Sequence, residues 1–225
     1  MAFDTDATMM AQHLLQATGV CCYFGEFQAV KSTDFIINAG ETIVLTGPNG
    51  AGKTTLLYCI AGIMRPTRGN VLIEGYDLYQ EEVSAKQRLA FVPDVPRFYP
   101  SITTWEHLKF ISLAHGISDD WESRAEGILH QFGMWESRDL YPHNLSRGMR
   151  LKLGISLALI RPFKVLVMDE PTSALDPESG QIFQEKLADI RKDGCGILLT
   201  SHDPKLAETL GARSWRMESG QLDTG

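Results

Sequence analysis

A glycine-rich turn between a short apolar strand and an amphipathic helix limits the possible folds of this chain more than any other segment. The turn reads Gly47-Pro-Asn-Gly-Ala-Gly-Lys-Thr54 and fits the pattern G-x-x-x-x-G-K-[ST]. The preceding run, Thr42-Ile-Val-Leu-Thr46, is β-rich without alternation, which is typical of a strand buried on both faces. After the turn, apolar residues recur at helical spacing from Leu56 to Met64. This arrangement predicts a phosphate-binding P-loop in an α/β core.

Each residue type in the turn has a chemical reason. Glycines let backbone N–H groups point inward around phosphate oxygens, where a side chain would block the approach. The helix that begins near Lys53 directs its positive dipole end at the same anion. Lys53 supplies a cation to the β- and γ-phosphates as a candidate catalytic residue, and the Thr54 hydroxyl can bind Mg²⁺. The expected nucleotide-binding residues here are Gly47, Pro48, Asn49, Gly50, Ala51, Gly52, Lys53, Thr54 and Thr55.

A chance glycine-rich turn is the alternative explanation of this segment. In a random chain of this length, the pattern would occur on the order of one time in a hundred. The strand before the turn and the helix after it lower that chance further, so ATP or another nucleotide is the expected ligand.

Strand and helix patterns alternate along most of the chain. This alternation, with continuous apolar strands, predicts a mainly parallel sheet covered by helices. Strand-like runs between residues 20 and 37 indicate an N-terminal antiparallel β subdomain, and helical patterns over about 94–162 indicate an inserted α-helical subdomain. Residues 1–18 carry little pattern and are expected to form an N-terminal extension. The predicted fold is therefore α/β, with a P-loop NTPase (RecA-like) core in a domain over 19–225.

Composition argues against several other functions. The net charge is −7, from 21 Lys and Arg against 28 Asp and Glu, so no nucleic acid partner is expected. No run approaches the roughly 20 consecutive apolar residues that span a bilayer as a helix. The N-terminus lacks the basic start and apolar stretch of a secretory signal, so we expect a cytoplasmic protein. Cys21, Cys22, Cys59 and Cys195 have no metal-ligand spacing and are expected to be reduced thiols.

A second buried strand ends in two acids, in the run Val165-Leu-Val-Met-Asp169-Glu170. The carboxyl end of a parallel strand is where such sheets bind ligands. Asp169 is placed to hold Mg²⁺, directly or through water, and Glu170 to polarise an attacking water as general base. A polar pair that merely ends a strand is the simpler alternative.

Three further segments are ambiguous when each is taken alone. Leu145-Ser-Arg-Gly-Met149 precedes a helix. Ser146 is a natural N-cap, and Gly148 has no side chain to cover the backbone. Ser173-Ala-Leu-Asp176 follows the acidic pair and could be an ordinary turn before a helix. Thr200-Ser-His202-Asp203 closes another apolar strand with a histidine, which is more often structural than functional.

In this order, the segments resemble the ABC ATPase family, whose motifs run Walker A, Q-loop, signature, Walker B, D-loop and switch histidine. The resemblance covers about residue 20 to the C-terminus. It implies that Ser146 and Gly148 are signature residues that bind ATP, that Asp176 lies in the D-loop beside the nucleotide, and that His202 is a catalytic residue contacting the γ-phosphate. It also implies that Phe24 stacks on adenine, with Tyr23 as the alternative.

The sequence departs from the family pattern at two places. Arg147 and Met149 replace a glycine and the glutamine of the usual LSGGQ signature. Asp94 stands where the Q-loop glutamine is expected, and an aspartate can still bind a Mg²⁺-linked water. Pro93-Asp94 and the run Ser-Arg-Gly-Met-Arg150 resemble the ABC-2 type exporter ATPases most closely.

The resemblance implies a mechanism that needs partners. A signature loop covers the nucleotide of the opposite subunit, so we expect a head-to-tail pair, a homodimer or two different ATPases, around two ATP·Mg²⁺. Separate membrane subunits would carry the cargo and dock near Asp94–Tyr99, where Phe98 and Tyr99 could receive them. The expected function is ATP hydrolysis that powers transmembrane transport, in the direction of export. The alternatives are an ABC-type ATPase with a non-transport mechanical role, and a P-loop kinase or GTPase, although no N-K-x-D guanine-reading segment is present.

Overall fold

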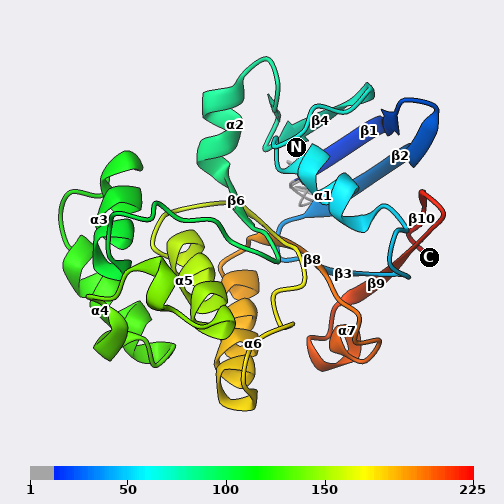
Figure 1. Ribbon diagram of the computed structural model, residues 1–225. Coiled ribbons are helices and arrows are strands. Elements are labelled where there is room, and N and C mark those ends of the chain that lie inside the picture. The colour runs from blue at the N-terminus through cyan, green and yellow to red at the C-terminus, as the bar shows by residue number, and fades with distance from the viewer. Residues whose placement is uncertain (1–12) are drawn as a thin grey trace, which may run out of the picture.

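Two β-sheets organise the chain in the computed structural model, which describes residues 13–225 (Figure 1). The smaller sheet is antiparallel with strand order β2-β1-β4-β5, and the larger has the order β10-β9-β3-β8-β7-β6. The strands are β1 (His13–Phe24), β2 (Phe27–Asn38), β3 (Thr42–Thr46), β4 (Arg68–Ile73), β5 (Tyr76–Asp77), β6 (Leu89–Val92), β7 (Val165–Met168), β8 (Gly196–Thr200), β9 (Arg213–Glu218) and β10 (Gln221–Asp223). The helices are α1 (Lys53–Ile60), α2 (Glu82–Arg88), α3 (Thr104–Ala114), α4 (Trp121–Gln131), α5 (Arg147–Leu159), α6 (Pro177–Lys192) and α7 (Leu206–Thr209), with 3-10 turns η1 (Trp135–Ser137) and η2 (Pro142–Asn144).

The larger sheet is parallel from β9 to β6, and only β10 runs antiparallel at its edge. Alternate residues of its central strands enter two hydrophobic cores, which explains why these strands have no polar alternation. One core contains α1 and the antiparallel sheet, and the other contains α3, α4, α5 and α6. In β7, for example, Val165 and Val167 face the first core, whereas Leu166 and Met168 face the second. The predicted α/β P-loop NTPase architecture is confirmed.

The antiparallel sheet begins earlier than the sequence pattern predicted. Residues 13–18, which we expected in an N-terminal extension, belong to β1, where Leu15 pairs with Ile37 of β2 and Ile73 of β4. Leu14 and Leu15 are both buried, so this part of β1 lacks the alternation that identifies a half-buried strand. Because β1 pairs with β2 on one side and with β4 on the other, it forms a strand even where its local sequence pattern is weak. The rest of the expected extension, residues 1–12, lies outside the described residues.

The helices between residues 94 and 162 gather on one side of the larger sheet, away from the antiparallel sheet (Figure 1). Thr103 and Glu106 have the spacing of a capping box in the sequence, and the structure forms it at the start of α3: Thr103 Oγ1 accepts from the Glu106 backbone N–H at 3.2 Å, and the Glu106 carboxylate accepts from the Thr103 N–H at 2.7 Å. Ser146 caps α5 as expected, accepting from the Met149 N–H at 3.2 Å.

Two expectations from composition can be compared with the described chain. Within residues 13–225, no helix combines the length and the apolar character needed to cross a bilayer. The four cysteines are free thiols, and Cys21, Cys22 and Cys59 are buried. Burial raises the pKa of the Cys59 thiol to about 12, so this group stays protonated at neutral pH.

Candidate nucleotide-binding site

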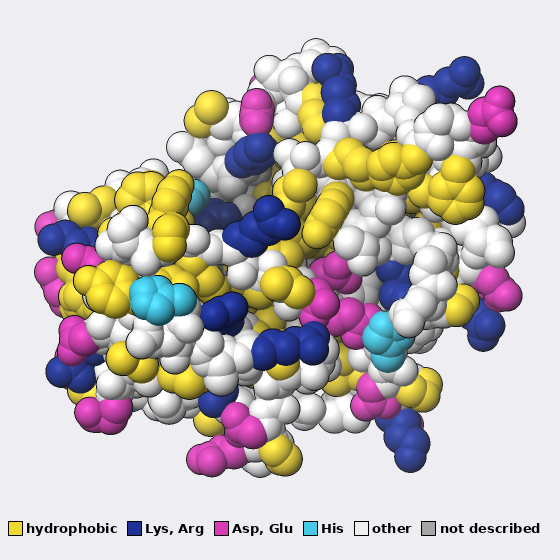
Figure 2. Space-filling view, in the orientation of Figure 1, with side chains coloured by type: hydrophobic (Ala, Val, Ile, Leu, Met, Phe, Trp, Pro, Cys, Tyr) yellow, Lys and Arg dark blue, Asp and Glu magenta, His cyan; other side chains and the backbone are white. Residues whose placement is uncertain are grey.

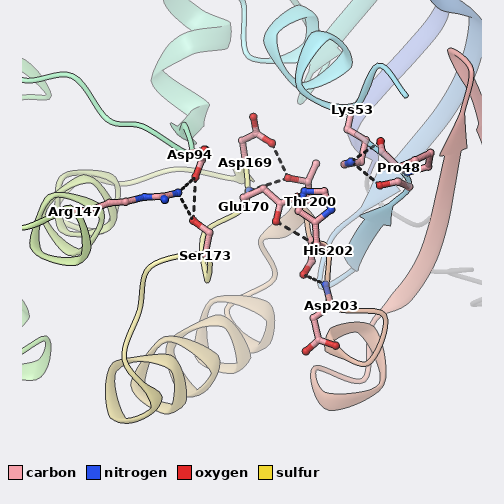
Figure 3. Close-up of polar contacts among 12 residues, drawn as sticks. Pro48, Lys53, Asp94, Arg147, Asp169, Glu170, Ser173, Thr200, His202 and Asp203 are labelled. Carbon is pink, nitrogen blue, oxygen red and sulfur yellow. Dashed lines mark hydrogen bonds and ion pairs between the residues drawn. The ribbon is translucent and has the colours of Figure 1, made fainter. Parts of the chain in front are cut away.

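The glycine-rich turn joins β3 to α1 and encloses a lysine. Gly52 precedes α1 with φ 104°, and a Cβ at this position would lie 2.3 Å from the carbonyl oxygen of Ala29. Only glycine therefore fits this bend. Lys53 is buried, and its ammonium donates to the carbonyl oxygens of Gly47 at 2.7 Å and Pro48 at 3.2 Å (Figure 3). The turn thus holds a cation among its own backbone groups, as a phosphate site requires.

A cavity of about 400 Å³ opens beside this turn, within the usual size range of ligand pockets. Segments that are far apart in the sequence line it together: the β1–β2 hairpin, the glycine-rich turn, and the ends of β6, β7 and β8. Acidic side chains gather in the hollow at the centre of Figure 2. The lining residues are Phe24, Phe27, Ala29, Asn49, Gly50, Ala51, Gly52, Lys53, Thr54, Thr55, Asp94, Asp169, Glu170 and His202.

A buried threonine fixes the two acids that follow β7. Thr200, the last residue of β8, donates its hydroxyl to Asp169 Oδ1 at 2.7 Å and accepts the Glu170 backbone N–H at 2.8 Å (Figure 3). Because β7 and β8 are parallel neighbours, their carboxyl ends meet at the same edge of the sheet. Sequence reasoning singled out only His202 in this segment, and the pairing of β7 with β8 is what gives Thr200 its role.

Glu170 faces His202 across the cavity floor. The His202 backbone N–H donates to Glu170 Oε2 at 3.2 Å, and His202 Nε2 lies 3.2 Å from Oε1. The second pair is within ion-pair distance but lacks hydrogen-bond geometry, so the buried Oε1 has no hydrogen bond from the described residues. Burial raises the pKa of Glu170, while His202 and Lys53 oppose the shift. A carboxylate with a raised pKa and a free oxygen is suited to accept a proton from water.

Two exposed phenylalanines stand at the mouth of the cavity. Phe24 and Phe27 pair across the β1–β2 hairpin, and they are 53% and 65% exposed. Both line the cavity, whereas Tyr23, the alternative adenine-stacking residue, is not among the lining residues. The geometry therefore favours Phe24 over Tyr23. It adds Phe27, which the sequence analysis missed although the two-residue turn Gly25-Glu26 could have predicted the pairing.

The expected magnesium ligands share this cavity. Thr54, Asp94 and Asp169 all line it, and hydroxyl and carboxylate oxygens are the donors that Mg²⁺ prefers. Among residues 13–225, no group of three or more His, Cys, Asp and Glu side chains could hold a metal ion. This donor set fits an ion that is bound by one or two carboxylates together with nucleotide phosphates.

Five residues expected to bind the nucleotide do not line the cavity: Gly47, Pro48, Ser146, Gly148 and Asp176. The Asp176 carboxylate caps α6, accepting from the Ser179 backbone N–H at 2.9 Å, and pairs with Lys152 at 3.0 Å. The Ser179 N–H and then Lys152 hold the pKa of Asp176 well below its usual range. Ser146 and Gly148 lie at the start of α5, so within a single chain they are outside the phosphate cavity.

Fold and cavity together define a P-loop nucleotide-binding protein. The family model described as ABC transporter matches residues 30–173, and the chain belongs to this family. It is 31% identical to the linearmycin resistance ATP-binding protein LnrL of Bacillus subtilis, over 93% of this chain and 68% of that protein. It is 34% identical to the Nod factor export ATP-binding protein I of Cupriavidus metallidurans, over 88% of this chain and 65% of that protein.

A solved structure described as the ATP binding subunit of an ABC transporter superimposes with a TM-score of 0.87 at 29% identity, covering 94% of this chain and 90% of that one. The chain is therefore an ATP-binding and ATP-hydrolysing subunit of the ABC transporter class. A transport role, rather than a mechanical role elsewhere, follows from these relatives.

Proposed function

We propose that this chain hydrolyses ATP as its magnesium complex to drive export through separate membrane subunits, and that it works at the cytoplasmic face of the membrane. The observation that carries the proposal is the single cavity shared by Lys53, Asp169, Glu170 and His202. The names of two relatives, a resistance protein and an export protein, support the direction of transport.

Each residue of the cavity has a proposed role. Lys53 exchanges its carbonyl partners for the β- and γ-phosphates, and Phe24 and Phe27 contact the adenine. Thr54 and Asp169 would hold Mg²⁺, and the ion would supply positive charge to the phosphates. Glu170 takes a proton from the attacking water, and His202, beside it, contacts the γ-phosphate.

A second copy, or a related ATPase, would complete the site. Ser146 and Gly148 sit at the N-terminal end of α5, where helix N–H groups attract anions. Neither residue lines the cavity of its own chain. A head-to-tail pair would place this end of α5 over the triphosphate of the other subunit, so two ATP·Mg²⁺ would be enclosed between the subunits.

The proposed docking surface for the membrane subunits lies beside the residues 94–99 segment. Val95 and Tyr99 are exposed, as is Phe110, which contacts Tyr99 edge-to-face at 5.5 Å. Phe98, by contrast, is half-buried and packs against His107 at 5.5 Å. Hydrophobic side chains gather over α3 and its surroundings in Figure 2. The exposed residues of this segment are therefore better docking candidates than Phe98.

Two measurements test the proposal. Purified protein should retain ATP and release phosphate with Mg²⁺, and Lys53→Met, which keeps most of the aliphatic stem, should lose ATP retention by about 10-fold or more because charge-assisted hydrogen bonds are lost. Retention unchanged in Lys53→Met would refute the role of the turn.

For docking, Val95→Asp should reduce the amount of a hydrophobic membrane protein that co-purifies from detergent extract. Val83→Asp is the control, because Val83 is equally exposed but lies on α2. Both variants should hydrolyse ATP normally when purified alone. Equal co-purification by the two variants would contradict this docking surface.

A further inference from the structure

Two residues that depart from the family pattern meet in the structure. Arg147, in the signature segment, lies with its Nη2 3.3 Å from Asp94 Oδ1, at the Q-loop position. Ser173 completes the cluster, donating its hydroxyl to the same Oδ1 at 3.0 Å and accepting from Arg147 at 3.4 Å (Figure 3). Asp94 follows β6, Arg147 is the first residue of α5 and Ser173 follows β7, so the contacts join three separate segments.

Arg147 occupies an unfavourable place unless it has a partner. It is the first residue of α5, where the helix dipole disfavours a cation, and the first turn of α5 contains no acidic residue. Arg150, in the same turn, is directed to the carbonyl oxygen of Pro142 at 2.9 Å. The negative charge of Asp94 therefore offsets the unfavourable interaction of Arg147 with the helix dipole.

A nearby cation also stabilises the charge of Asp94. It lines a cavity that already contains Asp169 and Glu170, and that must accept the negative charges of a triphosphate. Like charges that line one cavity repel one another, and Lys53 supplies a cation to the same cavity. A glutamine at this position, as in the usual family pattern, would add no charge.

The backbone holds the two segments together. A Cβ at Gly148 would lie 2.7 Å from the carbonyl oxygen of Ala174, so the start of α5 packs directly against the loop after β7. One turn further along α5, Lys152 pairs with Asp176 of the same loop region at 3.0 Å. Arg147 and Ser173 are thus adjacent because of packing, independently of their own hydrogen bond.

We propose that Arg147 is a positioning residue for Asp94, neutralising its carboxylate and holding it at the cavity wall so that an acid can replace the Q-loop glutamine. The inference rests on the proposed roles of the cavity residues. Arg147 contacts neither nucleotide in this role.

A double-mutant cycle on ATP binding tests the inference. The variants are Asp94→Asn, Arg147→Gln and the two combined, and the measurement is equilibrium binding of a fluorescent ATP analogue in EDTA and in Mg²⁺. Since the pair is 67% and 36% exposed at its two side chains, Arg147→Gln should weaken binding in EDTA by about two- to five-fold. Mg²⁺ should reduce this difference, because the ion neutralises charge on the phosphates that an uncompensated Asp94 would repel.

The combined variant shows whether the effects of the two substitutions are coupled. Once Asp94 is neutral, removing the charge of Arg147 should have little further effect on binding. Arg150→Gln is the matched control, because it removes from the same turn a cation that donates to the carbonyl oxygen of Pro142, and it should not reproduce the Mg²⁺-dependent difference.

Additive effects of the two substitutions, or an equal effect of Arg150→Gln, would overturn the inference. The measurement requires neither hydrolysis nor a membrane subunit. If the wild-type protein hydrolyses ATP but the mutant cycle is additive, only the role of Arg147 is refuted. If the wild-type protein releases no phosphate, the proposed function is refuted.

Discussion

Replacing Thr200 with valine should loosen both acids at the end of β7. Valine has the shape of threonine, and Thr200 is fully buried, so the substitution removes the hydroxyl with little change in packing. Asp169 Oδ1 loses a donor at 2.7 Å, and the Glu170 N–H loses its acceptor at 2.8 Å. A hydrogen bond to a charged group contributes about 1.5–3 kcal/mol, and a buried N–H left without a partner costs about 1–3 kcal/mol.

Together these losses amount to roughly 2.5–6 kcal/mol of unfolding free energy. For a chain of this size, each kcal/mol lowers the melting temperature by about 2–4 °C, so Tm should fall by roughly 5–24 °C. Thr200→Ser is the control, because it keeps the hydroxyl and loses one methyl group, at a cost of about 1 kcal/mol. Phosphate release should fall in Thr200→Val more than in Thr200→Ser, since Glu170 is less firmly placed.

Thermal unfolding followed by circular dichroism, with steady-state phosphate release on the same samples, checks both expectations. If Thr200→Val unfolds at the same temperature as Thr200→Ser and hydrolyses ATP at the same rate, the hydroxyl does not hold the acids in place and the reasoning is wrong.

The other predictions concern the cavity directly. Glu170→Gln should bind ATP but fail in multiple turnover and favour a stable dimer, and normal steady-state phosphate release would remove Glu170 as the base. Burial raises the pKa of Glu170, so wild-type turnover should be lost as the pH falls through a value above the ordinary glutamate pKa of about 4.3. Loss of turnover only at or below that pH would contradict a raised pKa for the base. Phe24→Ala and Phe27→Ala should each weaken ATP binding by about 5-fold or more, since a base–aromatic stack contributes about 1–3 kcal/mol. Competition by inorganic triphosphate, which has no base, should be unchanged in both variants.

The parts of the fold that the sequence predicted well are those with a strong local signal. β3 and β7 have apolar runs without alternation because both of their faces are buried, and the capping box at Thr103 is a local pattern that the structure retains. The missed elements depend on distant partners. α2 buries only Ala85, and Arg88 at its end is held by Glu74 at 2.8 Å. β10 is a three-residue strand whose sheet partner is β9.

The same division applies to the candidate site. The glycine-rich turn and the acid pair could be located because each is contiguous and follows a buried strand. Thr200, Phe27 and the pairing of Asp94 with Arg147 could not, because each depends on which strands or helices become neighbours. Arg147 and Asp94 were each recognised as departures from a family pattern, and only the structure brings the two departures into contact.

Gly148 shows why a motif residue can serve two purposes. The family resemblance assigns it to phosphate capture in another subunit, yet in this chain its missing side chain allows α5 to touch Ala174. The Ser173 N–H in turn donates to the carbonyl oxygen of Glu170 at 3.1 Å, so the packing of α5 reaches the proposed base through the backbone. Gly148→Ala should therefore disturb Glu170 as well as the intersubunit contact. Steady-state phosphate release, compared with ATP-dependent formation of the pair, would separate these effects. A pair that forms normally but hydrolyses ATP slowly would indicate a displaced Glu170, loss of pair formation would indicate the intersubunit contact, and normal behaviour in both assays would contradict the reasoning.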